Sequence, residues 1–121
     1  MSTKKVLLVD DSIATAKQLE KIVEETEGYE VAGHALNGIE GIKMFMSIRP
    51  DVVFMDIVMP EMDGLQAIRS IKNLDKEAKI VVISSAGGVG DKVTEALKFG
   101  AINVIPKPFE PEKVKELLGS I

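Results

Sequence analysis

Three aspartates that follow short apolar segments are the residues of this chain best suited to chemistry. Asp10 and Asp11 directly follow the apolar run of residues 6–9, and Asp56 follows the run of residues 52–55. A carboxylate at the end of a buried strand loses hydration, which costs free energy unless a cation or a hydrogen-bond donor compensates it. Three such groups on neighbouring strands therefore predict a cation site that includes a reactive aspartate.

The order of apolar and amphipathic segments predicts the elements that position these acids. Five short apolar runs alternate with stretches of helical period. The predicted strands are residues 5–9, 29–35, 52–56, 79–84 and 101–105. Five successive βα units predict an α/β fold with a parallel sheet, right-handed crossovers and helices on both faces. We expect this fold to form one domain over residues 1–121.

The residues within the predicted strands indicate their order in the sheet. The first, third and fourth runs are continuously apolar, as central strands covered on both faces must be. The second run alternates, and the fifth includes Asn103 and leads into Pro106, which cannot donate a ladder hydrogen bond. The second and fifth strands are therefore the predicted edges. The order 2-1-3-4-5 of a doubly wound, flavodoxin-like (βα)5 three-layer sandwich satisfies this pattern.

The stretches between the strands also carry signals for helix ends and buried faces. Pro111 suits the first turn of a helix, where its missing N–H is not needed, and Gly100 suits a helix end. In the second helix, Ile39, Ile42 and Met46 form the apolar stripe that we predict to face the sheet.

Polar side chains at the carboxyl ends of the predicted strands must meet at one edge of the sheet. They are Asp10, Asp11, Asp56, Ser84, Ser85 and Lys107. Three ionised carboxylates repel one another, and the remedies are protonation, a divalent cation or the ammonium group of Lys107. Mg²⁺, with Mn²⁺ as a substitute, suits this set because it takes few carboxylates and keeps waters that a phosphate oxygen can replace. One aspartate could then accept a phosphoryl group covalently.

Four short motifs at these strand ends carry a resemblance to a known family. They are Val-Asp-Asp at 9–11, Met-Asp-Ile-Val-Met-Pro-Glu-Met-Asp-Gly at 55–64, Ser-Ala at 85–86 and Lys-Pro-Phe at 107–109. In this order, the chain resembles the response-regulator receiver domains of two-component signalling from end to end. Among them it is most similar to the single-domain regulators of chemotaxis.

This resemblance implies a role for each residue of the acidic cluster. It implies that Asp56 is the phosphoacceptor. It also implies that Asp10 and Asp11 bind Mg²⁺ together with Asp56, and that the backbone carbonyl of Val58 is a further metal ligand. Val58 and Gly87 occupy positions that tune phosphoaspartate hydrolysis in the family. Neither side chain can orient an attacking water, so we predict no strong intrinsic phosphatase activity from them.

The resemblance also implies how the phosphorylated site would be sensed. Ser85 is the implied switch hydroxyl, with Ser84 as the alternative, and Lys107 is the implied phosphate-facing cation. The bond between Lys107 and Pro108 is implied to be cis, which only an X-Pro bond adopts at low cost. Val104 stands where the family often has an aromatic residue, so a large ring rotation is not available to this chain.

Composition excludes several other classes of protein. With no cysteine and a single histidine, the chain cannot form disulfides or a multi-histidine metal site, and we predict His34 to be a surface residue on an edge strand away from the cleft. A net charge of −4 argues against nucleic-acid binding. No apolar stretch is long enough to cross a bilayer, and the start lacks a secretory signal. We therefore expect a cytoplasmic monomer without membrane insertion.

These observations favour a phosphorylation-controlled switch over an enzyme. Its expected phosphodonor is a histidine kinase, and its expected target is a protein such as the flagellar motor switch. Beyond Mg²⁺-dependent self-phosphorylation and self-dephosphorylation, we expect no enzyme activity. Because the chain stops after the fifth helix, we expect a stand-alone protein, although a phosphorelay intermediate serving a phosphotransfer protein and a receiver module of a longer regulator remain alternatives.

Two other uses of this fold suit the sequence less well. An aspartate-nucleophile phosphatase of the haloacid dehalogenase type needs a second acid two residues after its nucleophile, where this chain has Val58 after Asp56 and Ser12 after Asp10. A flavodoxin needs aromatic residues around its flavin, and aromatic residues make up only 4% of the chain.

Overall fold

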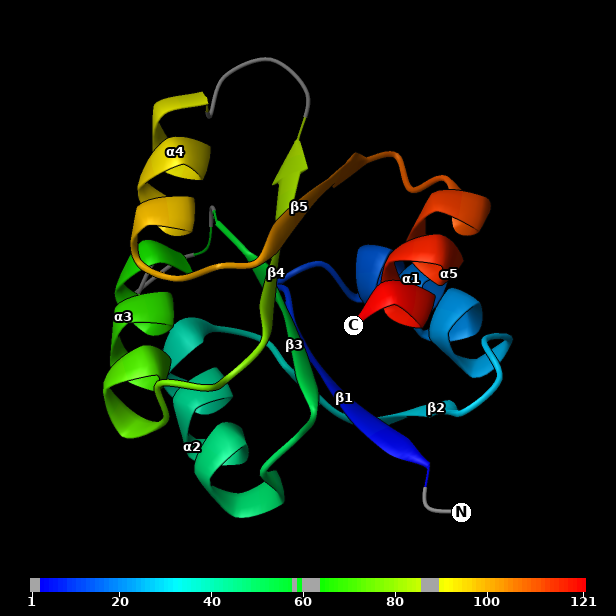
Figure 1. Cartoon of the computed structure of the whole chain (residues 1–121), viewed down its shortest axis with the longest axis horizontal. Helices are drawn as coiled ribbons and strands as arrows, with labels where there is room; N and C mark the ends of the chain where they lie inside the picture. The colour runs from blue at the N-terminus through cyan, green and yellow to red at the C-terminus, as the bar shows by residue number, and fades with distance from the viewer. Residues whose placement is uncertain (1–2, 58, 60–63, 86–89) are drawn as a thin grey trace.

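The computed structural model describes residues 3–57, 59, 64–85 and 90–121, with the backbone alone for residues 85, 90 and 91. Strands and helices alternate throughout this part of the chain (Figure 1). In order they are β1 (Lys4–Val9), α1 (Ile13–Glu24), β2 (Tyr29–Ala35), α2 (Gly38–Ile48), β3 (Val52–Asp56), α3 (Gly64–Leu74), β4 (Ile80–Ser85), α4 (Gly90–Lys98), β5 (Asn103–Lys107) and α5 (Pro111–Ser120).

The strands form one parallel sheet in the order β2-β1-β3-β4-β5. The predicted order and the predicted edge strands are therefore confirmed. Helices α1 and α5 cover one face of the sheet, and α2, α3 and α4 cover the other (Figure 1). This arrangement is the doubly wound, flavodoxin-like α/β fold.

Two apolar cores lie on the two faces of the sheet, and β1 contributes to both of them. Its residues Leu7 and Val9 pack towards α2 and α3, whereas Val6 and Leu8 pack towards α1 and α5. All four side chains are almost completely buried. Covering on both faces explains why the central strands carry continuous apolar runs rather than an alternating pattern.

The end of α4 moves the start of the fifth strand away from its predicted position. The Gly100 N–H bonds the Leu97 carbonyl, and the Ala101 N–H bonds the Ala96 carbonyl. Gly100 has a φ of 114°, which favours glycine. These bonds form a Schellman motif, so Ala101 completes the helix end instead of starting a strand.

Strand β5 therefore covers Asn103–Lys107 and not residues 101–105. Pro106 lies within this edge strand, opposite Ser84, and Lys107 lies opposite Ser85. The prediction that Lys107 follows the strand was wrong: Lys107 is its last residue, because the strand starts and ends two residues later than its apolar pattern indicates. Its last residue still reaches the carboxyl edge of the sheet.

Helix α2 faces the sheet with a different stripe from the predicted one. Ile42 packs against the core, but Ile39 and Met46 are 41% and 47% exposed. The buried residues include Phe45 and Gly41 instead. A Cβ on Gly41 would lie 3.0 Å from a valine side chain of β1, so the absence of a side chain there sets the close approach of helix and sheet.

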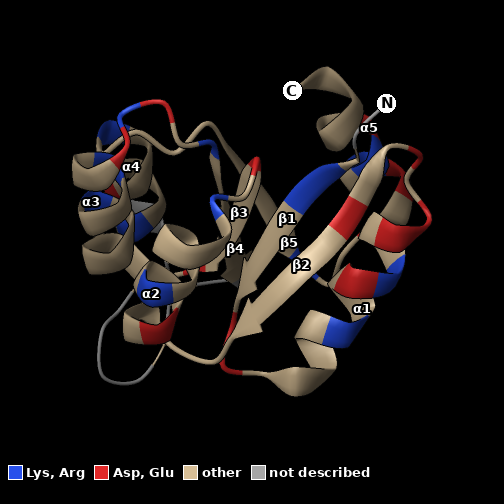
Figure 2. Cartoon of the chain, turned by 90° about the horizontal axis from the view of Figure 1, so that it is seen from below, with Lys and Arg blue, Asp and Glu red and all other residues tan. Residues whose placement is uncertain are grey.

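In the view of Figure 2, acidic and basic residues are mixed and do not form separate patches. Acidic and basic residues are interspersed along α1 (Figure 2). No helix in the described part of the chain combines the length and the apolar character that a membrane span requires.

Tyr29 connects β2 to the end of α5 beneath the amino edge of the sheet. Its hydroxyl donates a hydrogen bond of 2.6 Å to the Leu118 carbonyl, and the Lys4 ammonium lies 5.7 Å from the ring centroid. Burial of the phenol, helped by the negative charge of Asp51, raises the pKa of Tyr29 above its ordinary value. The interaction therefore depends on the protonated phenol.

Replacing Tyr29 by phenylalanine should lower the free energy of unfolding at pH 7 by about 1 kcal/mol, because the Leu118 carbonyl loses the 2.6 Å hydrogen bond from the phenol. The raised pKa means that the unfolded chain releases the phenol proton first. The stabilisation is therefore complete below a pH of about 10 and is lost as the pH rises through the folded-state pKa. Urea unfolding at neutral and alkaline pH should show the gap between the two proteins closing, and a constant gap would contradict this account.

Candidate functional site

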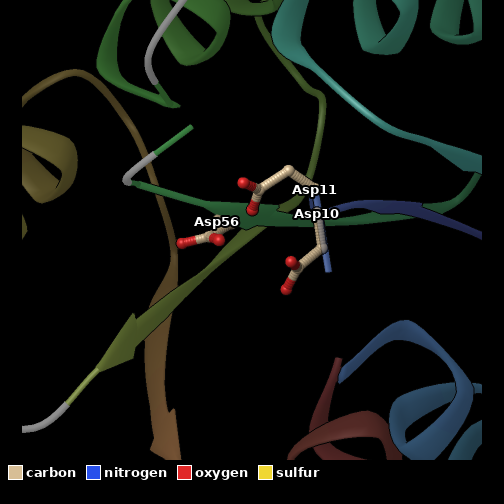
Figure 3. A group of neighbouring side chains, drawn as sticks. All are labelled: Asp10, Asp11 and Asp56. Atoms are coloured by element: carbon tan, nitrogen blue, oxygen red, sulfur yellow. The ribbon is translucent and has the colours of Figure 1, made fainter. Parts of the chain in front are cut away.

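The three predicted carboxylates meet at the carboxyl edge of the sheet. Strands β1 and β3 are neighbours, and Val9 at the end of β1 lies opposite Met55. Asp10, Asp11 and Asp56 each place one carboxylate oxygen within 4.8 Å of the others (Figure 3). Asp10 and Asp56 are 1% and 4% exposed, whereas Asp11 is exposed to solvent. Two of the three charges are therefore removed from water.

Lys107 compensates the two buried carboxylates from the far side of β4. Its Nζ lies 3.4 Å from Asp10 Oδ2 and 3.5 Å from Asp56 Oδ2. Its side chain is partly exposed, so the ammonium group remains in contact with solvent. Within the part of the chain that the structure describes, three clustered carboxylates face the one ammonium group of Lys107, which leaves an excess of negative charge.

The backbone around Asp10 is fixed by hydrogen bonds from both of its neighbouring segments. The Asp10 N–H donates to the Ala35 carbonyl at 3.0 Å, which extends the pairing of β1 with β2. The Ser12 N–H donates to Asp10 Oδ1 at 2.8 Å. Ser12 is also the N-cap of α1, where its side chain accepts a hydrogen bond from the Thr15 N–H. Strand end and helix start together orient the carboxylate.

The donor set fits a hard divalent cation. Asp10 Oδ2 is buried and accepts no hydrogen bond from the described residues, although Lys107 lies near it. Opposite ligands of an octahedral Mg²⁺ lie about 4.2 Å apart, which is close to the span of the three carboxylates. Oxygen ligands of this kind suit Mg²⁺ or Mn²⁺.

His34 lies closer to the site than the sequence indicated. It is on the edge strand β2, as predicted, but its Nε2 lies 2.9 Å from the Asp10 carbonyl oxygen. The ring is partly buried. The prediction that His34 lies away from the cleft was therefore wrong. Its position next to the last residue of β2 was the available signal, because that strand pairs directly with β1.

The remaining predicted residues differ in what the structure says of them. Ser84 and Ser85 end β4, opposite Pro106 and Lys107. Val104 is partly buried and packs against the core on the α2, α3 and α4 face. The roles expected for these residues stay predictions.

The expected metal ligand Val58, the hydrolysis-tuning residue Gly87 and the motif residue Ala86 lie outside the described residues. The peptide bond between Lys107 and Pro108, for which the resemblance implied a cis form, is cis.

Comparison with known proteins identifies the family. A family model for the response regulator receiver domain matches residues 6–119. The chain belongs to this family. The match covers almost the whole chain and includes every strand and helix that surrounds the acidic cluster. Receiver domains of this type are signalling switches of two-component systems rather than classical enzymes.

Individual relatives agree with this assignment. The chain is 45% identical to the chemotaxis protein CheY of Thermotoga maritima over 118 residues, covering 98% of this chain and 97% of that protein. It is 36% identical to a Borrelia burgdorferi chain solved as a CheX-CheY-BeF3-Mg²⁺ complex, with a TM-score of 0.89 and coverage of 98% and 89%. A Myxococcus xanthus protein-glutamate methylesterase matches at 35% identity over the whole chain, which corresponds to 35% of that longer protein.

The first residue of α3 is packed against the backbone of the site in this receiver domain. The Gly64 N–H donates to the Ile57 carbonyl at 2.8 Å. A Cβ at Gly64 would lie 2.2 Å from the Asp56 carbonyl oxygen and 2.6 Å from the Ile57 Cα. Both of these atoms belong to the backbone and cannot rotate away. Only glycine allows α3 to begin this close to the third strand.

Replacing Gly64 by alanine should displace the start of α3 and destabilise the domain by about 1 to 3 kcal/mol, as overpacking against fixed atoms does. Mg²⁺ affinity should fall as well, because the strained atoms belong to the Asp56 backbone. Gly119→Ala is the matched control, since a Cβ there meets no atom within 4 Å. Denaturant unfolding and calorimetric Mg²⁺ titration measure both effects. Equal stability of the two variants would show that the helix start moves freely.

Proposed function

We propose that this receiver domain, spanning residues 1–121, accepts a phosphoryl group from a histidine kinase on Asp56. The observation that carries the proposal is the buried Asp56 carboxylate between the Lys107 ammonium and two further acids that fit Mg²⁺. Similarity to proteins that are named as chemotaxis proteins supports a role in chemotaxis. We further propose that phosphorylation controls binding to a protein target, such as a component of the flagellar motor switch.

Asp56 is better placed than the other two acids to accept the group. Asp10 Oδ1 accepts the Ser12 N–H at the start of α1, and the Asp10 backbone is bonded to β2, so this residue is part of the turn between β1 and α1. Asp11 is exposed, where water competes with a phosphodonor. Asp56 ends the central strand β3, between the acids after β1 and the end of β4. A phosphoryl group on Asp56 would therefore lie between the acids that follow β1 and the end of β4.

The proposed transfer forms one bond and breaks one. A carboxylate oxygen of Asp56 attacks phosphorus while the bond from phosphorus to the kinase histidine nitrogen breaks, which leaves an acyl phosphate on Asp56. Bound Mg²⁺ would supply charge neutralisation at the phosphoryl oxygens. Lys107 supplies a second positive charge from the β5 side, 3.5 Å from the accepting carboxylate. Asp10 and Asp11 are the residues that would hold the metal with Asp56.

Incubation with acetyl phosphate and Mg²⁺ should add the mass of one phosphoryl group to the protein. Asp56→Asn should gain nothing, because an amide is not a comparable nucleophile. Asp11→Asn keeps the acceptor and loses a proposed metal ligand, so it should be modified more slowly and need more Mg²⁺. Intact-mass spectrometry and peptide mapping measure these outcomes, with a chelator as the metal control. Equal modification of the parent and Asp56→Asn would assign the acceptor elsewhere.

The proposed output is a rearrangement of the face formed by α4, β5 and α5. Phosphorylation would draw the hydroxyl of Ser85 towards Asp56 and so reorder the segment that follows β4, of which residues 86–89 lie outside the described part. Strands β4 and β5 pair up to Ser85 and Lys107, so a change at the end of β4 is next to β5. The small, partly buried Val104 would contribute repacking rather than a ring rotation.

Beryllofluoride with Mg²⁺, which mimics the phosphoryl group, should change amide hydrogen exchange in α4, β5 and α5. Helix α2 provides the internal reference, because it packs mainly against α3, β1 and β2. Asp56→Asn under the same conditions should show no change in any element. An unchanged exchange rate in the three output elements of the parent would defeat the proposed switch, even if Asp56 binds the mimic.

The choice between a chemotaxis switch and a phosphorelay intermediate depends on the partner. Binding of the beryllofluoride-treated protein to flagellar switch components supports the first. Onward transfer of the phosphoryl group from Asp56 to a histidine phosphotransfer protein supports the second.

A further inference from the structure

The partly buried imidazole of His34 makes a direct contact with the backbone of the acidic cluster. Its Nε2 lies 2.9 Å from the carbonyl oxygen of Asp10. A carbonyl oxygen can only accept a hydrogen bond, so Nε2 carries the hydrogen and donates it. The contact is therefore directional and fixes which ring nitrogen is protonated.

An irregularity in β2 is what directs the ring to this position. The pairing of β1 with β2 shifts by one residue at Ala32, which has no partner on β1. Without this bulge, His34 would lie opposite Val9 and share its sheet face towards α2. With it, His34 lies opposite Leu8, on the face covered by α1 and α5. Bulges commonly redirect a side chain in this way next to functional sites.

The adjacent residue holds the bulged strand in place against α2. A Cβ at Gly33 would lie 2.6 Å from the terminal methyl of Met44 and 2.9 Å from a methyl of Ile48. The backbone of Gly33 therefore lies directly against two side chains of α2. This contact places the part of β2 that carries His34 next to α2.

The Asp10 carbonyl belongs to the peptide group that joins Asp10 and Asp11, the two proposed metal ligands that follow β1. This group is planar, so an anchored carbonyl also fixes the direction of the Asp11 N–H and Cα. The Asp10 N–H is bonded to Ala35, but this bond lies on the other side of the Asp10 Cα. Among the described residues, His34 is the donor to the Asp10 carbonyl.

We propose that His34 is a positioning residue of the metal site, which holds the Asp10–Asp11 peptide plane so that both carboxylates face the cation. This inference rests on the proposed role of these acids in binding Mg²⁺. Mg²⁺ requires near-ideal octahedral geometry, so a rotation of this peptide plane would lower the affinity of the site for the ion. Groups behind metal ligands influence affinity by roughly tenfold or more. A single neutral hydrogen bond to the backbone is worth less, about three- to tenfold in affinity.

Mg²⁺ titration of His34→Leu, His34→Gln and the parent tests this role by NMR. His34→Leu has no donor, and its Mg²⁺ affinity should fall about three- to tenfold, with a displaced Asp11 amide resonance even without metal. The side-chain amide of His34→Gln can donate to the same carbonyl, so it should recover most of the affinity and move the resonance back. Glu30→Gln changes an exposed residue of the same strand and should match the parent.

Two results would overturn the positioning role. They are unchanged Mg²⁺ affinity in His34→Leu, and an equal loss in the leucine and glutamine variants, which would indicate ring packing alone. Imidazole nitrogen spectra of the parent provide a check that needs no variant, because a ring with its hydrogen only on Nδ1 contradicts the bond. The acetyl phosphate experiment is independent of all three. Failure to modify Asp56 would reject the proposed function while leaving the effect of His34 on Mg²⁺ measurable.

Discussion

The structure of the site depends on the compensation of buried negative charge. Each contact of about 3.5 Å between Lys107 and a carboxylate is worth roughly 4 to 5 kcal/mol of Coulomb attraction at an effective dielectric constant of about 20, before desolvation is subtracted. The three carboxylates, whose oxygens lie within 4.8 Å of one another, repel one another in turn, and solvent weakens the repulsions that involve the exposed Asp11. One ammonium group therefore leaves the cluster electrostatically incomplete. The site favours an added cation, and a cation makes it a suitable place for a phosphoryl group.

This arrangement of charges depends on the strand order β2-β1-β3-β4-β5. Asp56 and Lys107 belong to β3 and β5, with β4 between them, and the ammonium group reaches across the end of β4 to both buried acids. Close packing also positions the helices next to the site. Gly64 brings α3 against the Asp56 backbone, and Ser12 begins α1 directly after the acids of β1. Helices on both faces thereby bury the central strands that carry the site at their carboxyl ends.

Most of this arrangement follows from patterns that the sequence displays. Continuous apolar runs mark the central strands, and acids at their ends mark the edge where the site forms. The differences arise where the controlling contact has no hydropathy signal. Gly41 sets the face of α2 through its missing side chain, and Ala101 closes a helix although it resembles the start of a strand. His34 was expected away from the cleft, and the register shift at Ala32 that places it opposite Leu8 has no hydropathy signal either.

That register shift shows how a second element can influence chemistry without contributing a ligand. Strand β2 supplies none of the clustered acids, yet it accepts the Asp10 N–H and donates to the Asp10 carbonyl. The aspartates of β1 are thus held from the edge strand, while Asp56 is held from α3. Phosphorylation would add charge where Lys107 already contacts two acids. The response that we propose lies at β4 and β5, because these strands pair up to Ser85 and Lys107, next to the ammonium group that would face the added charge.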